Sequence, residues 1–392
     1  MNQNWNTYKL GEIGEFFGGV TSIKKEDYGF GTPFIPYKNV FKNSKIDISN
    51  LELMNVNSND LKKRNAVYGD IFFTASSETP DEVAISSVLL DHVENLTYNG
   101  FCKRLRLHNF DTLLPEFARY YFKSHQFRTQ VYQYKTGDVR FNISQESLSK
   151  IAITIPDIKD QKHIADVLTS LDDKIELNHQ MNQTLESIAQ AIFKEWFVDF
   201  NFPGFDGEFI DGLPKGWRMG TIDDVSTLIA GGDKPRDFSD YETETHNIPI
   251  YSNGISNDGL FGFTSNARII VESVTVSARG TIGYPVLRQK PYFPIVRLLS
   301  VIPKVEVASA KYIFLWLKNS NIKGTGTTQQ QLTAPDFKRF DVLIPEKSCV
   351  DNFTEIADNI YSKIFENKKQ IEVIEQIRSS LIPKLMTGKI EI

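Results

Sequence analysis

Aromatic and polar residues suited to contacting nucleic-acid bases recur at matching places in the two halves of this 392-residue chain. Arginine, asparagine and glutamine can hydrogen-bond base edges, and glycine-rich loops can bring backbone amides close to phosphates. In the first half the candidates are Tyr37, Lys38, Asn39, Ser76, Ser77, Lys135, Thr136, Arg140 and Asn142. In the second half they are Tyr251, Asn253, Arg279, Thr327, Gln329, Gln330 and Gln331. Each could instead be part of a solvated turn, but their recurrence favours two different recognition surfaces on one scaffold.

Motifs for catalysis are sparse. The chain has no P-loop, no Asn/Asp-Pro-Pro-Tyr/Phe segment of base methyltransferases, no Gly-x-Ser-x-Gly elbow and no histidine spacing typical of a metal site. Pro156-Asp157 followed by Asp172-Asp173-Lys174 fits the loose pattern of metal-dependent nucleases. However, Asp172 falls on a predicted helix, whereas nuclease carboxylates cluster where they can share a metal ion. We therefore expect no catalytic residue, no metal and no cofactor bound to this chain.

The charge of the chain is unevenly distributed. Lys and Arg total 44 and Asp and Glu total 49, a net charge of -5, which lacks the basic excess of a dedicated nucleic-acid binder. By segment, the net charge is +1 over 1–150, -7 over 151–216, +3 over 217–340 and -2 over 341–392. The acidity thus belongs to two segments, which suggests that they serve a different purpose from the rest.

Composition excludes several classes of protein. Hydrophobic residues make up 41% of the chain, too many for a disordered protein. No apolar run approaches the ~18 residues of a membrane span, and the N-terminus lacks the features of a signal peptide. The two cysteines, Cys102 and Cys349, form neither a disulfide framework nor a zinc motif. We expect a cytoplasmic protein.

An internal repeat organises the chain. Ile155-Pro156 aligns with Ile344-Pro345 at an offset of 189, and the alignment continues without a gap through the following helix. Near the start, Trp5 aligns with Trp217 at an offset of 212. The sequence therefore predicts one unit of roughly 200 residues used twice.

The segment after each repeated proline has a strict heptad pattern. Apolar residues alternate in steps of four and three, which is typical of a coiled-coil seam. If the two helices pair antiparallel, Asn182 faces the Asn367 layer, and Asn178 and Asn367, at equivalent positions, help to define the register. The alternative is an amphipathic helix lying on its own domain. The seams are Ile164, Leu168, Leu171, Ile175, Asn178, Asn182, Leu185, Ala189, Ile192 and Trp196, then Phe353, Ala357, Ile360, Ile364, Asn367, Ile371, Ile374, Arg378, Leu381 and Leu385.

These patterns predict an α/β (α+β) protein in which two similar globular domains are joined by an antiparallel coiled coil with pseudo-two-fold symmetry. The predicted segments are a first domain over 1–155, a helical region over 156–202, a second domain over 203–344 that begins with a linker over 203–216, and a helical region over 345–392. Residues 164–196 would span about 48 Å, equivalent to at most about 14 base pairs of DNA.

The helical motifs resemble those of the specificity subunits of type I restriction–modification systems. The resemblance is carried by Gln161-Lys162-His163-Ile164-Ala165-Asp166-Val167-Leu168, by Leu171-Asp172-Asp173-Lys174-Ile175-Glu176-Leu177-Asn178 and by the run from Leu185 to Phe200. Pro214-Lys215-Gly216-Trp217 is similar to the entry of a second target-recognition domain, and Leu385-Met386-Thr387-Gly388 to the family's C-terminal motif. The resemblance covers the whole chain.

The resemblance implies a non-catalytic DNA reader, active in defence against foreign DNA, whose two target-recognition domains each bind half of a split sequence. It implies as partners double-stranded DNA, two modification subunits that carry S-adenosylmethionine and methylate adenine, and in some assemblies a restriction subunit that uses ATP. It also places the docking of partner subunits on Trp196, Phe197 and Phe200. The alternatives are a self-contained nuclease or DNA methyltransferase, and a coiled-coil adaptor that binds only proteins.

Overall fold

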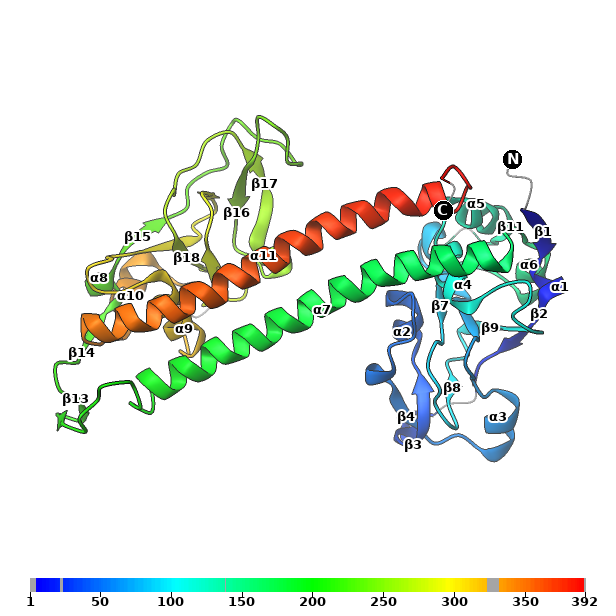
Figure 1. The fold of residues 1–392 in the computed structure, drawn as a ribbon, viewed down its shortest axis with the longest axis horizontal. Coiled ribbons are helices and arrows are strands. Elements are labelled where there is room, and N and C mark those ends of the chain that lie inside the picture. Colours follow the sequence, from blue (N-terminus) through cyan, green and yellow to red (C-terminus); the bar gives the residue numbers. More distant parts are fainter. Residues whose placement is uncertain (1–4, 22–23, 138, 323–330, 391–392) are drawn as a thin grey trace. The chain divides into compact units, whose positions relative to one another are not determined.

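The computed structural model describes residues 5–21, 24–137, 139–322 and 331–390, which divide into two compact units (Figure 1). The first unit consists of residues 1–177 and 370–392, and the second of residues 178–369. Each unit therefore contains one globular domain and half of each long helix.

The first domain contains two main sheets. Four antiparallel strands form one sheet in the order β2 (Gly14–Gly18), β9 (Cys102–Leu107), β5 (Ile71–Thr74) and β7 (Ser86–Val88). The second sheet has the order β4 (Glu52–Met54), β3 (Tyr28–Ile35) and β8 (Thr97–Tyr98), with β3 and β8 parallel. Two separate antiparallel pairs complete the first domain: β1 (Asn6–Lys9) pairs with β11 (Ala152–Ile155), and β6 (Ser76–Ser77) pairs with β10 (Phe141–Asn142).

Helices pack against these sheets because apolar side chains on the helices are buried against apolar side chains on the strands. Strand β5 is buried along its whole length, and Phe73 packs against Phe122 and Phe127 near α4 and α5. Ser124 caps α5, since its hydroxyl accepts a hydrogen bond from the Phe127 amide, and Ser144 caps α6 in the same way. The helices are α1 (Leu10–Ile13), α2 (Tyr37–Lys42), α3 (Ser58–Lys63), α4 (Pro115–Tyr121), α5 (His125–Tyr134) and α6 (Gln145–Lys150).

The second domain repeats the two main sheets and the pairing of its first and last strands, which confirms the predicted repeat; the β6–β10 pair of the first domain has no counterpart among the described strands of the second. Its four-stranded antiparallel sheet has the order β15 (Ser226–Ala230), β21 (Leu299–Pro303), β18 (Ser273–Val276) and β19 (Pro285–Arg288). Its three-stranded sheet has the order β17 (Leu260–Thr264), β16 (Ile248–Tyr251) and β20 (Phe293–Pro294), again with one parallel pair. The remaining elements are β12 (Phe209–Ile210), β13 (Leu213–Pro214), β14 (Arg218–Thr221), β22 (Asp341–Ile344), α8 (Ile222–Val225), α9 (Ala310–Lys318) and α10 (Ala334–Lys338).

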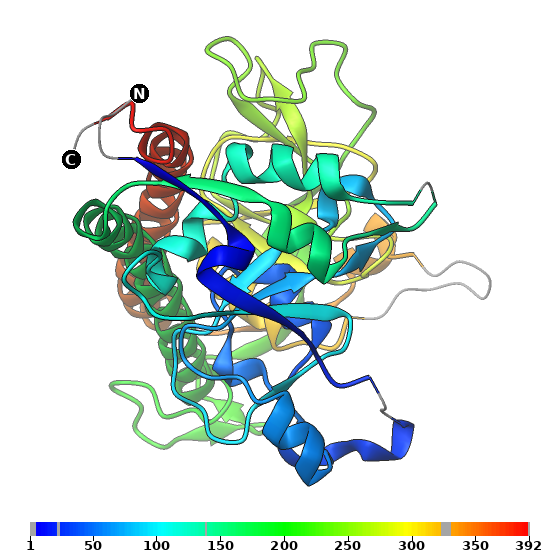
Figure 2. The same ribbon diagram turned by 90° about the vertical axis from the view of Figure 1, so that its right-hand side faces the viewer.

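The two long helices, α7 (Ile158–Phe197) and α11 (Lys347–Leu385), pack against each other in each unit. In the first unit the start of α7 shares a core with the end of α11, where Ile164 and Leu168 lie in the same cluster as Leu385 (Figure 2). In the second unit Phe193, near the end of α7, contacts Phe353, near the start of α11. The helices therefore run antiparallel, as the heptads predict.

The seam contains the expected asparagines. The Asn367 side-chain amide donates to the Asn182 side-chain oxygen at 2.9 Å, and Asn178 is fully buried. A buried amide pair specifies one register, because any slip would leave polar groups among apolar ones. None of the helices described here has the length and apolar composition needed to cross a bilayer.

Candidate nucleic-acid interface

Most of the first-half candidates gather around one hollow. A cavity of about 680 Å³ is lined by Ser76, Thr136, Arg140 and Asn142, and an adjoining one of about 320 Å³ by Tyr37, Ser76, Ser77 and Arg140. Because Ser76, Arg140 and Phe101 line both, the two cavities form one surface, which we call the first-domain hollow. The elements that build it are α2, β6, β10, the start of α6 and the turn between β8 and β9.

A short hairpin, here called the finger (Lys135 to Asn142, described except for residue 138), forms one wall of the first-domain hollow. Thr136 and Asn142 exchange backbone hydrogen bonds of 2.9 and 2.8 Å. Gly137 has φ +98°, and a Cβ there would lie 2.2 Å from the Arg140 carbonyl oxygen, so the turn requires glycine. The tip is exposed, with Val139 89% accessible beside Arg140.

Aromatic rings brace the finger and the opposite wall. The Lys135 ammonium lies 4.3 Å from the ring centroids of both Tyr132 and Phe141, which fixes the base of the finger. Across the hollow, the Tyr37 hydroxyl donates to the Ser76 carbonyl at 2.9 Å. Burial raises the pKa of Tyr37, so its hydroxyl remains a neutral donor.

The hollow also contains carboxylates. Ser77 donates to Glu82 at 2.8 Å, and hydrogen bonds from Thr79 and Ser77 hold the pKa of Glu82 below its ordinary value. Glu78 lies on the same lining. Arginine suits the two acceptors on the major-groove edge of guanine, and a carboxylate can accept from the cytosine amino group. The hollow therefore places an arginine and two carboxylates on one lining.

Besides Lys135, which braces the base of the finger, two first-half candidates do not line the first-domain hollow. Lys38 is exposed on α2 but does not line the hollow. Asn39 is only 4% exposed, and its amide donates to the carbonyl oxygens of Asp47 and Asn50 while it accepts from the Asp47 amide. Its assignment as a base-reading residue is wrong, because its hydrogen-bonding groups are used to hold a loop.

The second-half candidates that the structure describes meet at the matching strand ends. Asn253 accepts from the amide of Ala278 at 2.7 Å and donates to the Val296 carbonyl, so it ties two loops together. The next residue, Arg279, is exposed and donates to Gln331 at 3.4 Å. Thr327, Gln329 and Gln330 lie outside the described residues.

Tyr251 is held by its neighbours rather than free to turn. The Arg288 guanidinium lies 3.5 Å from the centre of the Tyr251 ring, and the Tyr292 ring packs against it at 5.8 Å. Arg288 in turn donates to the Thr275 hydroxyl at 2.9 Å. Tyr251 therefore lies at the end of β16 as part of a fixed stack with Arg288 and Tyr292.

The helical aromatics differ from the prediction. Phe197 is buried in the second unit, where it packs against Tyr312 of α9 and against Phe353 and Trp217. Trp196 contacts Phe353, and Phe200 contacts Trp217, so both are partly covered by the same cluster. The assignment to partner docking is wrong for Phe197, because residues of its own unit bury its ring and leave it no surface for a partner.

The nuclease-like pattern has a structural explanation. The Asp157 side chain accepts from the Asp160 amide at the start of α7, as a helix cap does. Asp172 accepts from Arg119 of α4 at 2.7 Å and from Arg378 of α11 at 2.5 Å. Fifteen residues along one helix separate the two carboxylates by about 22 Å, too far to share a metal ion. Among the described residues no group of metal-ligating side chains is placed to hold one.

Comparison with known proteins decides the family. The sequence model of the type I restriction modification DNA specificity domain matches residues 2–187 and 214–376, which together are most of the chain. The chain belongs to this family. It is the DNA-specificity subunit of a type I restriction–modification system and not itself an enzyme.

Similar proteins match from about two thirds to the whole length of this specificity subunit. The MjaIX specificity subunit of Methanocaldococcus jannaschii is 26% identical over 434 residues, covering 100% of this chain and 94% of the relative. The HindI specificity subunit of Haemophilus influenzae is 26% identical over 326 residues, 63% of this chain and 71% of that one. The crystal structure of a type I S subunit from M. genitalium shares the fold, with a TM-score of 0.66 at 15% identity over 98% of this chain and 97% of that one.

Sequence analysis of this specificity subunit missed several residues of the hollow. Phe101 is 58% exposed on the turn after Asn99-Gly100, and Lys103 and Gln145 lie on the same lining. An aromatic side chain directly after an Asn-Gly turn is a usable signal, since turns seldom need one. Gln145 gave no such signal, because only the fold brings the start of α6 to the finger.

Proposed function

We propose that this specificity subunit reads a split DNA sequence, one half with each domain. The first half would be read by the first-domain hollow and the finger, and the second by the loops that carry Asn253, Arg279 and Gln331. The observation that carries the proposal is that polar candidates from distant parts of the chain converge at corresponding strand ends in both domains. Their chemistry differs between the domains, as reading two different half-sites requires.

We further propose that the chain works in the cytoplasm, where it assembles with two modification subunits. S-adenosylmethionine would be bound by those subunits, and ATP by a restriction subunit where one joins. Ile188 on α7 and Ile377 on α11 occupy equivalent positions in the repeat and are 44% and 43% exposed. Two equivalent apolar positions suit two copies of one partner, and they replace Phe197 as docking candidates.

Reconstitution of DNA methylation tests this function. The purified chain would be mixed with a type I modification subunit and S-adenosylmethionine, and methylated adenines in a random-sequence DNA library would be mapped. We expect one split motif, with two constant parts and a gap of fixed length. The chain alone should methylate nothing and should bind DNA weakly, because its net charge of -5 attracts few phosphates.

Each alternative function predicts a different result in this experiment. A self-contained enzyme would cut or methylate DNA without added subunits. A protein-only adaptor would form the complex but would leave the choice of methylated sequence unchanged when the chain is replaced by a relative. Methylation without sequence selectivity would contradict the proposal.

A further inference from the structure

Two turns at equivalent places in the domains each present one exposed side chain. The turn between β8 and β9 carries Phe101, and the turn between β20 and β21 carries Arg297. The strands on both sides of each turn pair in the same register, so the two residues correspond in the repeat. Phe101 is 58% exposed and lines the first-domain hollow, and Arg297 is exposed as well. The same scaffold position is therefore apolar in one domain and cationic in the other.

A glycine packs closely against each turn. Gly19 and Gly231 occupy equivalent positions in the repeat. A Cβ on Gly19 would lie 2.2 Å from the Asn99 carbonyl oxygen, and one on Gly231 would lie 2.7 Å from the Ile295 carbonyl oxygen, so only glycine allows this approach. The Gly231 carbonyl also accepts a hydrogen bond from the Arg297 amide at 3.0 Å. The backbone beneath the exposed arginine is thereby fixed.

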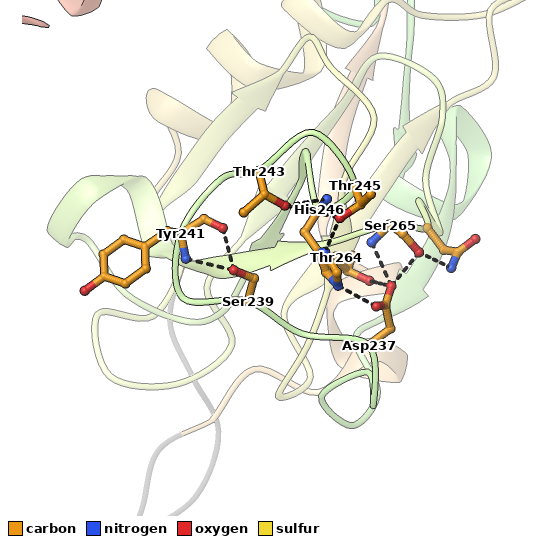
Figure 3. Close-up of polar contacts among 9 residues, drawn as sticks. Asp237, Ser239, Tyr241, Thr243, Thr245, His246, Thr264 and Ser265 are labelled. Atoms are coloured by element: carbon orange, nitrogen blue, oxygen red, sulfur yellow. Dashed lines mark hydrogen bonds and ion pairs between the residues drawn. The ribbon is translucent and has the colours of Figure 1, made fainter.

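The loop that begins at Gly231 is itself fastened by a carboxylate, as Figure 3 shows. This loop joins β15 to β16, and its Asp237 accepts from the amide and hydroxyl of Ser265 at 2.8 and 2.5 Å and from His246 Nε2 at 2.6 Å. Hydrogen bonds, those from Ser265 above all, hold the pKa of Asp237 well below its ordinary value. The loop is therefore tied to the end of β17, and the turn that carries Arg297 rests on a fixed support.

Both turns constrain the residue that they expose. In the first domain the Phe101 amide donates to the Asn99 side-chain oxygen at 2.8 Å, and the Phe101 carbonyl accepts from the Ala75 amide at 2.8 Å. In the second domain Val296 and Arg297 both have left-handed backbone angles, with φ +51° and +60°. A β-branched residue such as Val296 rarely adopts these angles, and strain of this kind is found mostly at binding and catalytic sites.

One asparagine brings two arginine-bearing turns of the second domain together. The Asn253 side-chain amide donates to the Val296 carbonyl at 2.6 Å, and its oxygen accepts from the Ala278 amide at 2.7 Å. Arg297 follows the first of these partners and Arg279 follows the second. Within the described part of the chain, neither guanidinium has a carboxylate partner. Two exposed cations held near each other without a neutralising acid favour an acceptor-rich or anionic ligand.

We propose that Arg297 and Phe101 are base-reading residues, one for each half-site. The Arg297 guanidinium offers two parallel N–H donors, which match the O6 and N7 acceptors of guanine in the major groove. Phe101 offers an apolar ring on the same lining as Arg140, and such a ring suits the 5-methyl group of thymine. This inference rests on the proposed function, and it assigns one base to each of the two turns.

Base analogues test the assignment without any change to the protein. The split motif is first mapped with the wild-type chain in the reconstituted complex, and affinity is then measured with single bases replaced in both halves. 7-Deazaguanine in place of guanine removes the N7 acceptor, and uracil in place of thymine removes the methyl group. At one guanine of one half we expect the wild-type complex to lose about tenfold in affinity. At one thymine of the other half we expect a loss of about fourfold.

Each variant should lose sensitivity to one analogue only. Arg297→Ala should bind the guanine and 7-deazaguanine sites equally well and still distinguish thymine from uracil. Phe101→Ala should show the opposite pattern, because it keeps the arginine and loses the apolar contact. The matched control is Arg339→Ala, which removes an exposed arginine at the end of α10 and should retain both sensitivities.

The outcomes separate this inference from the function on which it rests. If Arg297→Ala weakens binding equally on all sequences, Arg297 contacts phosphate and its assignment is wrong. If both variants act on the same half of the motif, or if each remains sensitive to its analogue, the inference is wrong while the proposed function stands. If the wild-type complex yields no split motif, the proposed function itself fails, and this is known before any analogue is used.

Discussion

Arg140 reaches solvent because Gly137 allows the finger to turn tightly and because Lys135 clamps its base between two rings. Its guanidinium lines both parts of the first-domain hollow, whereas Arg279 of the second domain donates to Gln331. Each arginine thus belongs to the proposed DNA-contacting surface of one domain only. A side chain that contacts a base edge changes sequence preference, and one that contacts phosphate changes only affinity.

Replacing Arg140 with alanine should therefore affect one half-site. We expect the complex to lose about 10- to 100-fold in affinity for its own motif, and to accept other bases at one position of the first half. Competition binding against single-base variants of the motif measures this. Arg279→Ala is the matched control and should relax the second half instead. Equal loss on all sequences, with a smaller salt dependence, would mark Arg140 as a phosphate contact.

The long helices are attached to the two domains by different chemistry at equivalent positions. In the first unit Asp172 of α7 accepts from Arg119, Arg378 and the Tyr120 hydroxyl. In the second unit the equivalent residue of α11 is Tyr361, whose ring packs edge-on against Phe314 of α9 at 5.9 Å. The same helix-to-domain contact is thus a charge network in one half and an aromatic pair in the other.

Substitution of Asp172 by asparagine should loosen the first unit. Two arginines would lose their charged partner, and removing one member of a largely buried ion pair costs about 3–5 kcal/mol. Hydrogen exchange of α4 and of the first half of α7 should accelerate accordingly. Tyr361→Phe is the control at the repeat-equivalent site. Its hydroxyl makes no hydrogen bond to the described residues, so protection in the second unit should be retained. Unchanged exchange in Asp172→Asn would show that packing alone holds this contact.

At the scale of the whole chain, the helical segments differ from the domains in net charge. The acidity is concentrated over 151–216 and 341–392, at -7 and -2, where the two long helices lie, while the segments that carry the domains sum to +4. The two domains carry a modest positive charge and the helical region is acidic. This distribution fits a protein whose partners supply much of the attraction for phosphate. Helices α7 and α11, of 40 and 39 residues, each contribute residues to both units.

If the long helices set the gap between half-sites, shortening them should shorten the gap. Deleting one heptad from each helix, residues 175–181 and 368–374, preserves the seam pattern and retains Asn182 and Asn367. Each helix loses about 10.5 Å, so the preferred gap should shrink by about three base pairs while the bases in each half stay the same. Methylation mapping of the reconstituted complex gives the gap directly. Inserting one heptad in each helix should lengthen the gap. An unchanged gap in both variants would show that the helices do not set the distance between the half-sites.

Much of this architecture could be predicted from the sequence because it is periodic. The heptads predicted two long helices and the Asn182–Asn367 pair, and the offsets predicted a repeated domain, since a repeated pattern of apolar residues buries the same way twice. The candidate DNA-contacting residues were harder. Candidates on turns that follow matching strands remain predictions, and polarity alone did not distinguish Asn39, which is used internally, from Arg140, which is exposed.

The sequence by itself determined the repeat, the helical seam, the distribution of charge and the lack of catalytic motifs, because all of these are local patterns along the chain. Only the tertiary structure decided which polar residues share the first-domain hollow, that Phe197 is covered by α9, and that Asp172 is bound by two arginines from other helices. These depend on contacts between segments tens to hundreds of residues apart. Such contacts are set by how the sheets and helices pack, and no local spacing encodes them.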